Sequence, residues 1–177
     1  MVQAEAAERF LSAPMLADVD PRSRLAVLGS LVEVRRAVGS VLLVQGQPND
    51  HLTFLIGGTA AIERKRGDAP AEILATLTAP SVFGMTTFFR MNSPTFTVRA
   101  TSEVWLLTLY HPAHDKLRKK DPEAAEELAL AALRILCERF DDLDRMYSDY
   151  MAHHPDDRSK ANEWAGFRSR LFEEPPD

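Results

Sequence analysis

The hydrophobic residues between about Leu31 and Tyr110 fall in short runs that polar residues separate. Two of the clearest runs are Val41-Leu42-Leu43-Val44 and Thr53-Phe54-Leu55-Ile56. Turn-forming residues stand between the runs, at Gly39, Gly46, Gly57, Gly58, Gly67 and Pro80. Short apolar segments at regular spacing, bounded by glycine and proline, are typical of an all-β roll or barrel. This pattern predicts a β-roll over residues 31–110.

Both ends of the chain have the pattern of helices instead. Ala4 to Leu11 predicts a short helix, and Asp20-Pro21 is typical of a helix start, with a capping residue followed by proline. A short basic helix is expected from His114 to Lys120. Asp121-Pro122 then begins a helix without internal glycine or proline that continues to about Met151. We therefore predict a mainly β fold with flanking helices, in four parts: N-terminal helices (1–30), β-roll (31–110), C-terminal helices (111–152) and tail (153–177).

Six large side chains on the long helix recur at alternating spacings of three and four. They are Leu133, Leu136, Phe140, Leu143, Tyr147 and Tyr150. Such a heptad stripe favours pairing with a second copy of the helix and predicts a homodimer. The alternative is that the six residues pack against the chain's own roll.

Composition and charge exclude several classes of function. The net charge of −5 offers no basic surface for DNA or RNA, so a nucleic-acid partner is not expected. The only cysteine, Cys137, excludes an internal disulfide and a cysteine-ligated metal site. The sequence shows neither a signal peptide nor an apolar run long enough to span a membrane. These features predict a cytoplasmic protein without a membrane partner.

No arrangement of residues in the sequence is typical of an enzyme. We find no Ser-His-Asp order, metal-ligand spacing or glycine-rich phosphate loop, and we expect neither a cofactor nor a metal. The tail places Trp164, Phe167 and Leu171 on one face of a short predicted helix. That face would dock either on its own dimer or on another protein.

Two stretches of the sequence resemble a known family. The first is Gly39-x-x-Leu42-x-x-Gln45-Gly46-Gln47-x-x-Asp50-x-x-x-Phe54-Leu55-Ile56-x-Gly58, and the second combines Phe83-Gly84 with Thr97-Val98-Arg99-Ala100. Together they resemble the cyclic-nucleotide-binding domain, which the catabolite activator protein and kinase regulatory subunits share. The resemblance implies a β-roll, a ligand cradle within it, and dimerisation through the long helix that follows.

The chain departs from this family at the two charged positions of the cradle. In the family a glutamate holds the ribose hydroxyl and an arginine holds the cyclic phosphate. Here Met85 and Pro94 stand at those positions. Losing both contacts weakens binding by on the order of 10²- to 10⁴-fold. The family resemblance places the cradle at Phe83, Gly84, Met85, Pro94, Thr95, Phe96 and Thr97.

Two hypotheses of function follow. In the first, Met85 and Phe96 help to fill a vestigial pocket, and the chain is a dimeric regulatory or scaffolding module that acts through another protein. In the second, the chain is a sensor whose altered pocket takes a cyclic nucleotide or another anion, with Arg90 or Arg99 replacing the missing arginine. A DNA-binding regulator is disfavoured, because the tail after the long helix does not form a basic helix-turn-helix.

Overall fold

The computed structural model describes residues 2–153 and Gly166. The chain divides into two compact units, residues 1–133 and 134–177. The first unit contains every β-strand that the structure describes, four of the helices and the beginning of the fifth. The described part of the second unit is the remainder of that fifth helix and Gly166. The predicted tail face of Trp164, Phe167 and Leu171 lies outside the described residues.

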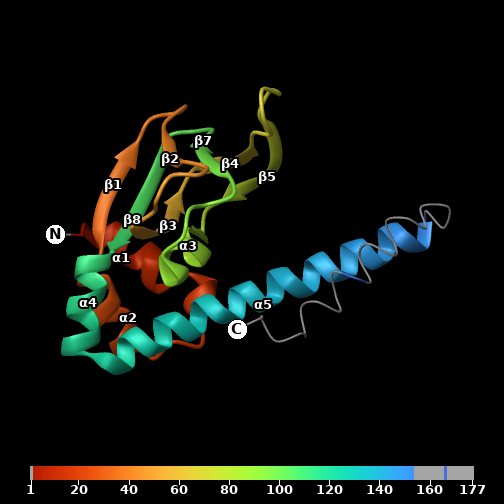
Figure 1. The fold of residues 1–177 in the computed structure, drawn as a ribbon. Coiled ribbons are helices and arrows are strands. Elements are labelled where there is room, and N and C mark those ends of the chain that lie inside the picture. The colour runs from red at the N-terminus through yellow and green to blue at the C-terminus, as the bar shows by residue number, and fades with distance from the viewer. Residues whose placement is uncertain (1, 154–165, 167–177) are drawn as a thin grey trace. The chain divides into compact units, whose positions relative to one another are not determined.

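The first unit is built on two antiparallel four-stranded sheets (Figure 1), with strand orders β1-β8-β3-β6 and β2-β7-β4-β5. Their bounds are β1 Val32–Arg36, β2 Val41–Leu43, β3 His51–Gly57, β4 Thr59–Arg64, β5 Glu72–Thr78, β6 Ser81–Phe83, β7 Thr97–Ala100 and β8 Val104–Tyr110. The strands begin and end within two residues of the predicted range 31–110. The prediction of a mainly β roll with flanking helices is confirmed.

A cluster of buried side chains from both sheets forms the interior of the roll. Leu55, Phe83 and Leu106 come from one sheet, and Leu43 and Val98 from the other. The glycine-punctuated pattern produces this arrangement because each short strand must turn sharply into the next. At the β3–β4 corner Gly58 has a φ of +85°, and a Cβ there would lie 2.2 Å from the carbonyl oxygen of Glu103. Only glycine fits this corner.

Five α-helices and one 3₁₀ turn flank the strands within the described residues: α1 Ala4–Leu11, the turn η1 Pro14–Leu16, α2 Pro21–Leu28, α3 Met85–Arg90, α4 His111–Lys120 and α5 Pro122–His153. Both predicted caps are confirmed. The Asp20 carboxylate accepts a hydrogen bond from the Arg22 backbone N–H at 2.8 Å, and Asp121 accepts one from Ala124 at 3.1 Å. The helix expected from His114 begins earlier, at His111, because proline is tolerated in the first turn of a helix.

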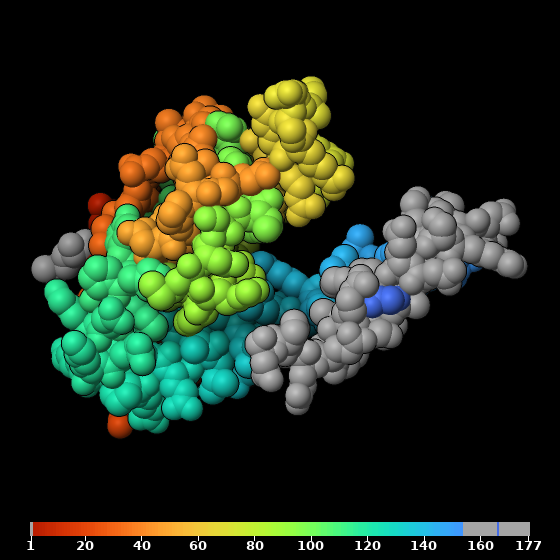
Figure 2. Space-filling model, in the orientation of Figure 1, coloured from red at the N-terminus to blue at the C-terminus, as the bar shows by residue number. Residues whose placement is uncertain are grey.

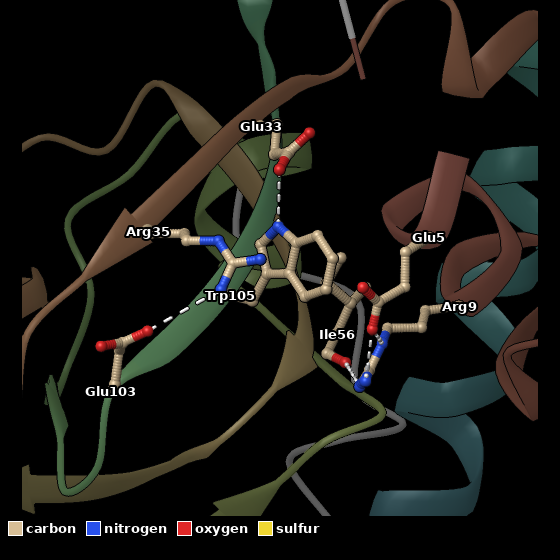
Figure 3. Close-up of polar contacts among 7 residues, drawn as sticks. All are labelled: Glu5, Arg9, Glu33, Arg35, Ile56, Glu103 and Trp105. Atoms are coloured by element: carbon tan, nitrogen blue, oxygen red, sulfur yellow. Dashed lines mark hydrogen bonds and ion pairs between the residues drawn. The ribbon is translucent and has the colours of Figure 1, made fainter. Parts of the chain in front are cut away.

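Trp105 of β8 connects helix α1 to the first sheet (Figure 3). Its indole N–H donates a hydrogen bond to the Glu33 carboxylate at 2.8 Å, and the residue is only 6% exposed. The Arg35 guanidinium lies 3.9 Å from the ring centroid and that of Arg9 lies 5.3 Å away. Arg9 also donates a hydrogen bond to the carbonyl oxygen of Ile56 at 3.2 Å. These contacts fix α1 against β1, β3 and β8.

None of the helices between residues 2 and 153 combines the length and the apolar composition that crossing a membrane requires. Over the same residues, His, Cys, Asp and Glu side chains nowhere gather in a group of three or more that could hold a metal ion.

Candidate functional site

The candidate cradle begins where β6 turns into α3. Gly84 lies at this junction as the capping residue of α3, with a φ of +85°. A Cβ at Gly84 would lie 2.9 Å from the carbonyl oxygen of His51, so the close approach of the two backbones requires glycine. Met85 follows as the first residue of α3, and its side chain is only 2% exposed. The residue that the resemblance places at the family's glutamate is therefore a buried apolar side chain.

A pair of buried polar side chains fixes the first turn of α3. The Asn49 amide donates hydrogen bonds to the Thr87 hydroxyl at 2.8 Å and to the carbonyl oxygen of His51 at 2.7 Å. Thr87 in turn donates to the carbonyl oxygen of Gly84 at 3.0 Å. The sequence pattern does not predict this pair. Asn49 and Thr87 are 38 residues apart, and no local motif connects them.

The second half of the cradle is the loop that leads into β7. Pro94 is buried, and its carbonyl oxygen accepts a hydrogen bond from the Gly46 N–H at 2.8 Å. The Thr97 hydroxyl accepts one from the backbone of Gln45 at 3.1 Å. The ring of Phe96 packs against the interior cluster that contains Phe83, whereas Thr95 is exposed. Apolar groups thus fill the loop on its inner side.

The two arginines considered as replacements occupy different environments. Both carboxylate oxygens of Glu63 lie 3.2 Å from Nε of Arg99, and Arg99 also donates to the carbonyl oxygen of Gly39 at 3.2 Å. These contacts make Arg99 a poor candidate for a phosphate ligand. Arg90 lies in the last turn of α3 with an exposed side chain and is the better candidate.

Two histidines of α4 pack against the far end of α3. The His111 ring stacks on Phe88, with centroids 4.3 Å apart and planes 10° from parallel. The His114 ring meets Phe88 at 5.1 Å in an edge-on arrangement. Burial lowers the pKa of His114, and the charge of Arg118 lowers it further. The carboxylate of Asp115 raises it and His111 lowers it, with smaller effects. His114 is therefore neutral in the folded protein at neutral pH.

The pKa of His114 leads to a testable pH dependence. Since folding lowers this pKa below 6.5, the unfolded chain takes up a proton more readily than the folded chain as the pH falls below that value. The stability contributed by neutral His114 is thus present above pH 6.5 and lost on acidification. We expect urea unfolding midpoints to fall less steeply between pH 7 and pH 5 in His114→Gln than in the unaltered chain. His153→Gln, on the exposed end of α5, is the matched control, and equal slopes in all three proteins would contradict the assignment.

The comparison with protein families can now be set against this geometry. The profile of the family described as "Cyclic nucleotide-binding domain" matches residues 33–121. This chain belongs to the cyclic nucleotide-binding domain family. The matched residues include nearly all of the roll, the whole candidate cradle and α4. The resemblance identified from the glycine pattern is confirmed.

Solved structures agree on the fold. The N-terminal domain of a transcriptional regulator from Streptomyces coelicolor A3(2) is 28% identical, with 75% of this chain and 95% of that one covered at a TM-score of 0.64. A cyclic nucleotide-binding domain from Methylobacillus flagellatus is 17% identical, with 80% of each chain covered at a TM-score of 0.69. The Thermus thermophilus catabolite activator protein is 21% identical, with 76% and 63% covered at 0.62. The chain matches none of the curated proteins compared with it.

The family is one of regulators, which are typically not enzymes. Membership gives this chain the fold and the class of a regulatory domain.

Proposed function

We propose that this chain is a regulatory module that does not bind cyclic AMP or cyclic GMP in the manner of its family and acts instead through protein contacts as a homodimer. The observation that carries the proposal is the 2% exposure of Met85 at the position of the family's glutamate. A thioether at this position accepts no strong hydrogen bond from a ribose hydroxyl and carries no charge.

The second half of the cradle supports the same conclusion. Pro94 has no side-chain donor for a cyclic phosphate, and Phe96 contributes apolar bulk to the interior cluster. The missing charge-assisted hydrogen bond is worth about 1.5–3 kcal/mol, and an unpaired ribose hydroxyl costs about 1–3 kcal/mol more. Together these losses raise a micromolar Kd to between about 0.1 and 10 mM.

A second candidate function is a sensor of a different small anion. Two observations favour it: Arg90 is exposed at the end of α3, and Thr95 is exposed in the loop that leads into β7. In this alternative an anion binds to Arg90 rather than at Pro94. An Arg90→Gln variant distinguishes the two candidate functions. If the chain is an anion sensor, the substitution should abolish binding of the anion. If the chain is a module without a ligand, the variant and the unaltered chain should give the same result, with no anion bound by either.

The test is calorimetric titration of the full chain with cyclic AMP and with cyclic GMP. We expect no saturable heat for either nucleotide at concentrations up to about 0.1 mM, because both charged contacts are missing. A thermal-shift panel of cyclic mono- and dinucleotides extends the test to other ligands, since a bound ligand raises the melting temperature. A Kd below about 10 µM for cyclic AMP or cyclic GMP would overturn the proposal.

The dimer in this proposal is formed by α5, the 32-residue helix from Pro122 to His153. Three residues of its heptad stripe are about half exposed: Leu133 at 53%, Phe140 at 47% and Leu143 at 53%. Large apolar side chains in a row on one helix favour burial against a partner helix.

A further inference from the structure

A cavity of about 720 Å³ lies between α3, α4 and the first turns of α5, apart from the cradle residues that the family resemblance identifies. The surfaces of α3 and α4 adjoin the beginning of α5 on the face shown in Figure 2. The volume is within the range of small-molecule sites in proteins, about 300–1,000 Å³. The functions proposed above leave this cavity without a role.

Aromatic rings line one side of the cavity: Phe88, Phe89, His111 and His114. Phe88 and Phe89 meet edge to face at 5.2 Å, and His114 meets Phe89 in the same way at 6.1 Å. Because burial lowers the pKa of His114, its ring adds an uncharged aromatic surface beside Phe89 at neutral pH. Such a surface favours a planar ring in offset or edge-on contact.

Charges of both signs stand around the same cavity. Arg118 and Lys119 of α4 supply two cations, and Asp115 of α4 and Glu126 of α5 supply two carboxylates. Arg118 and Asp115 are 3.9 Å apart and both are more than 60% exposed, so this ion pair is weak and solvated. A ligand with one charge would face attraction and repulsion together, whereas a zwitterion satisfies both signs.

We propose that this cavity binds a free aromatic α-amino acid. The ring packs on Phe89 and His114, which lie against the buried Phe88. The α-carboxylate faces the cations of α4, and the α-ammonium faces Glu126. The site is independent of the proposed function, since it uses none of the cradle residues. A ligand bound there would nevertheless contact α3, the helix that begins at the cradle residue Met85, and could therefore influence the cradle through that helix.

The first experiment compares ligands that differ by one charged group. By calorimetry or ligand-observed NMR on the full chain, we expect L-tryptophan to bind. Tryptamine, which lacks the carboxylate, and indole-3-propionate, which lacks the ammonium, should each bind at least about threefold more weakly. L-leucine, which lacks the ring, should bind more weakly still. Absence of binding for L-tryptophan, L-phenylalanine and L-tyrosine at about 10 mM, or equal binding of L-tryptophan and its two analogues, would overturn the proposal.

The second experiment assigns each charge to its protein partner. Glu126→Gln should weaken L-tryptophan about threefold and leave indole-3-propionate unchanged, whereas Lys119→Gln should weaken L-tryptophan and leave tryptamine unchanged. Glu123→Gln and Lys120→Gln remove the same charges from exposed neighbouring positions that do not line the cavity, and they should have no effect. An equal loss of L-tryptophan affinity in the control variants, or no loss of affinity in the cavity variants, would overturn the assignment. Titration of cyclic AMP tests the proposed function separately. Failure of the amino-acid site can therefore be distinguished from failure of the proposed function.

Discussion

The double substitution Phe140→Asp with Leu143→Asp is expected to give a monomer of 19.8 kDa, whereas the unaltered chain should have twice that mass. Light scattering on a sizing column at tens of micromolar measures both. The two aspartates would stand in the middle of the heptad stripe, where a paired helix excludes water. An unpaired charge in such a contact costs several kcal/mol, enough to abolish a dimer of moderate affinity.

The exposed fractions of the stripe are the reason that we expect two copies of the helix to pair. Phe140 and Leu143 are each about half exposed in the single chain. Full burial of a side chain of this kind is worth about 1.5–3 kcal/mol, and a two-fold axis lets one stripe serve both partners. Arg145 pairs with Asp142 of its own helix at 2.7 Å, so part of the acidic flank is neutralised before the partner arrives.

The matched control places the same two charges away from the stripe. Ser148→Asp with Ala152→Asp alters exposed positions of the same helix, off the line of Phe140 and Leu143, and should leave the dimer intact. Circular dichroism of each variant shows whether the helix has survived the substitution. A mass near 19.8 kDa for the unaltered chain would mean that the helix is not a dimer contact, and the prediction would be wrong.

The parts of the fold that could be predicted from the sequence depend on neighbouring residues. Asp20 and Asp121 cap helices through hydrogen bonds to backbone two and three residues away, so the signal is complete within one turn. Gly58 occupies a corner that needs a positive φ, and its spacing from the other glycines indicated the short strands. Because such requirements are local, few other backbone conformations are compatible with these segments of the sequence.

The parts that could not be predicted depend on residues far apart in the chain. Trp105 and its hydrogen-bond partner Glu33 are 72 residues apart in the sequence, and Arg99 and Glu63 are 36 residues apart. Nothing local distinguishes Arg99 from a free cation, and only the β4–β7 pairing places it beside a carboxylate. The aromatic cavity was missed for the same reason, because Phe88 and His111 meet only when α4 packs against α3.

The cradle is an intermediate case, since the resemblance identified its positions but not their burial. Met85→Glu restores the residue type of the family at a side chain that is 2% exposed. We expect this substitution to lower the free energy of unfolding by about 3 kcal/mol, because a buried carboxylate without a partner loses its hydration. Urea denaturation measures the loss, which should be larger at pH 8 than at pH 5, where protonation relieves the buried charge.

Two matched variants separate burial from other effects of the substitution. Met85→Leu keeps the apolar volume and should cost less than about 1.5 kcal/mol. Thr86→Glu places the same carboxylate one residue further along α3, at an exposed position, and should be nearly neutral. Millimolar cyclic AMP should not restore the stability of Met85→Glu, since Pro94 still supplies no phosphate contact. If Met85→Glu is as stable as the unaltered chain and binds cyclic AMP, then position 85 opens onto the cradle, and the prediction that burial closes this position is wrong.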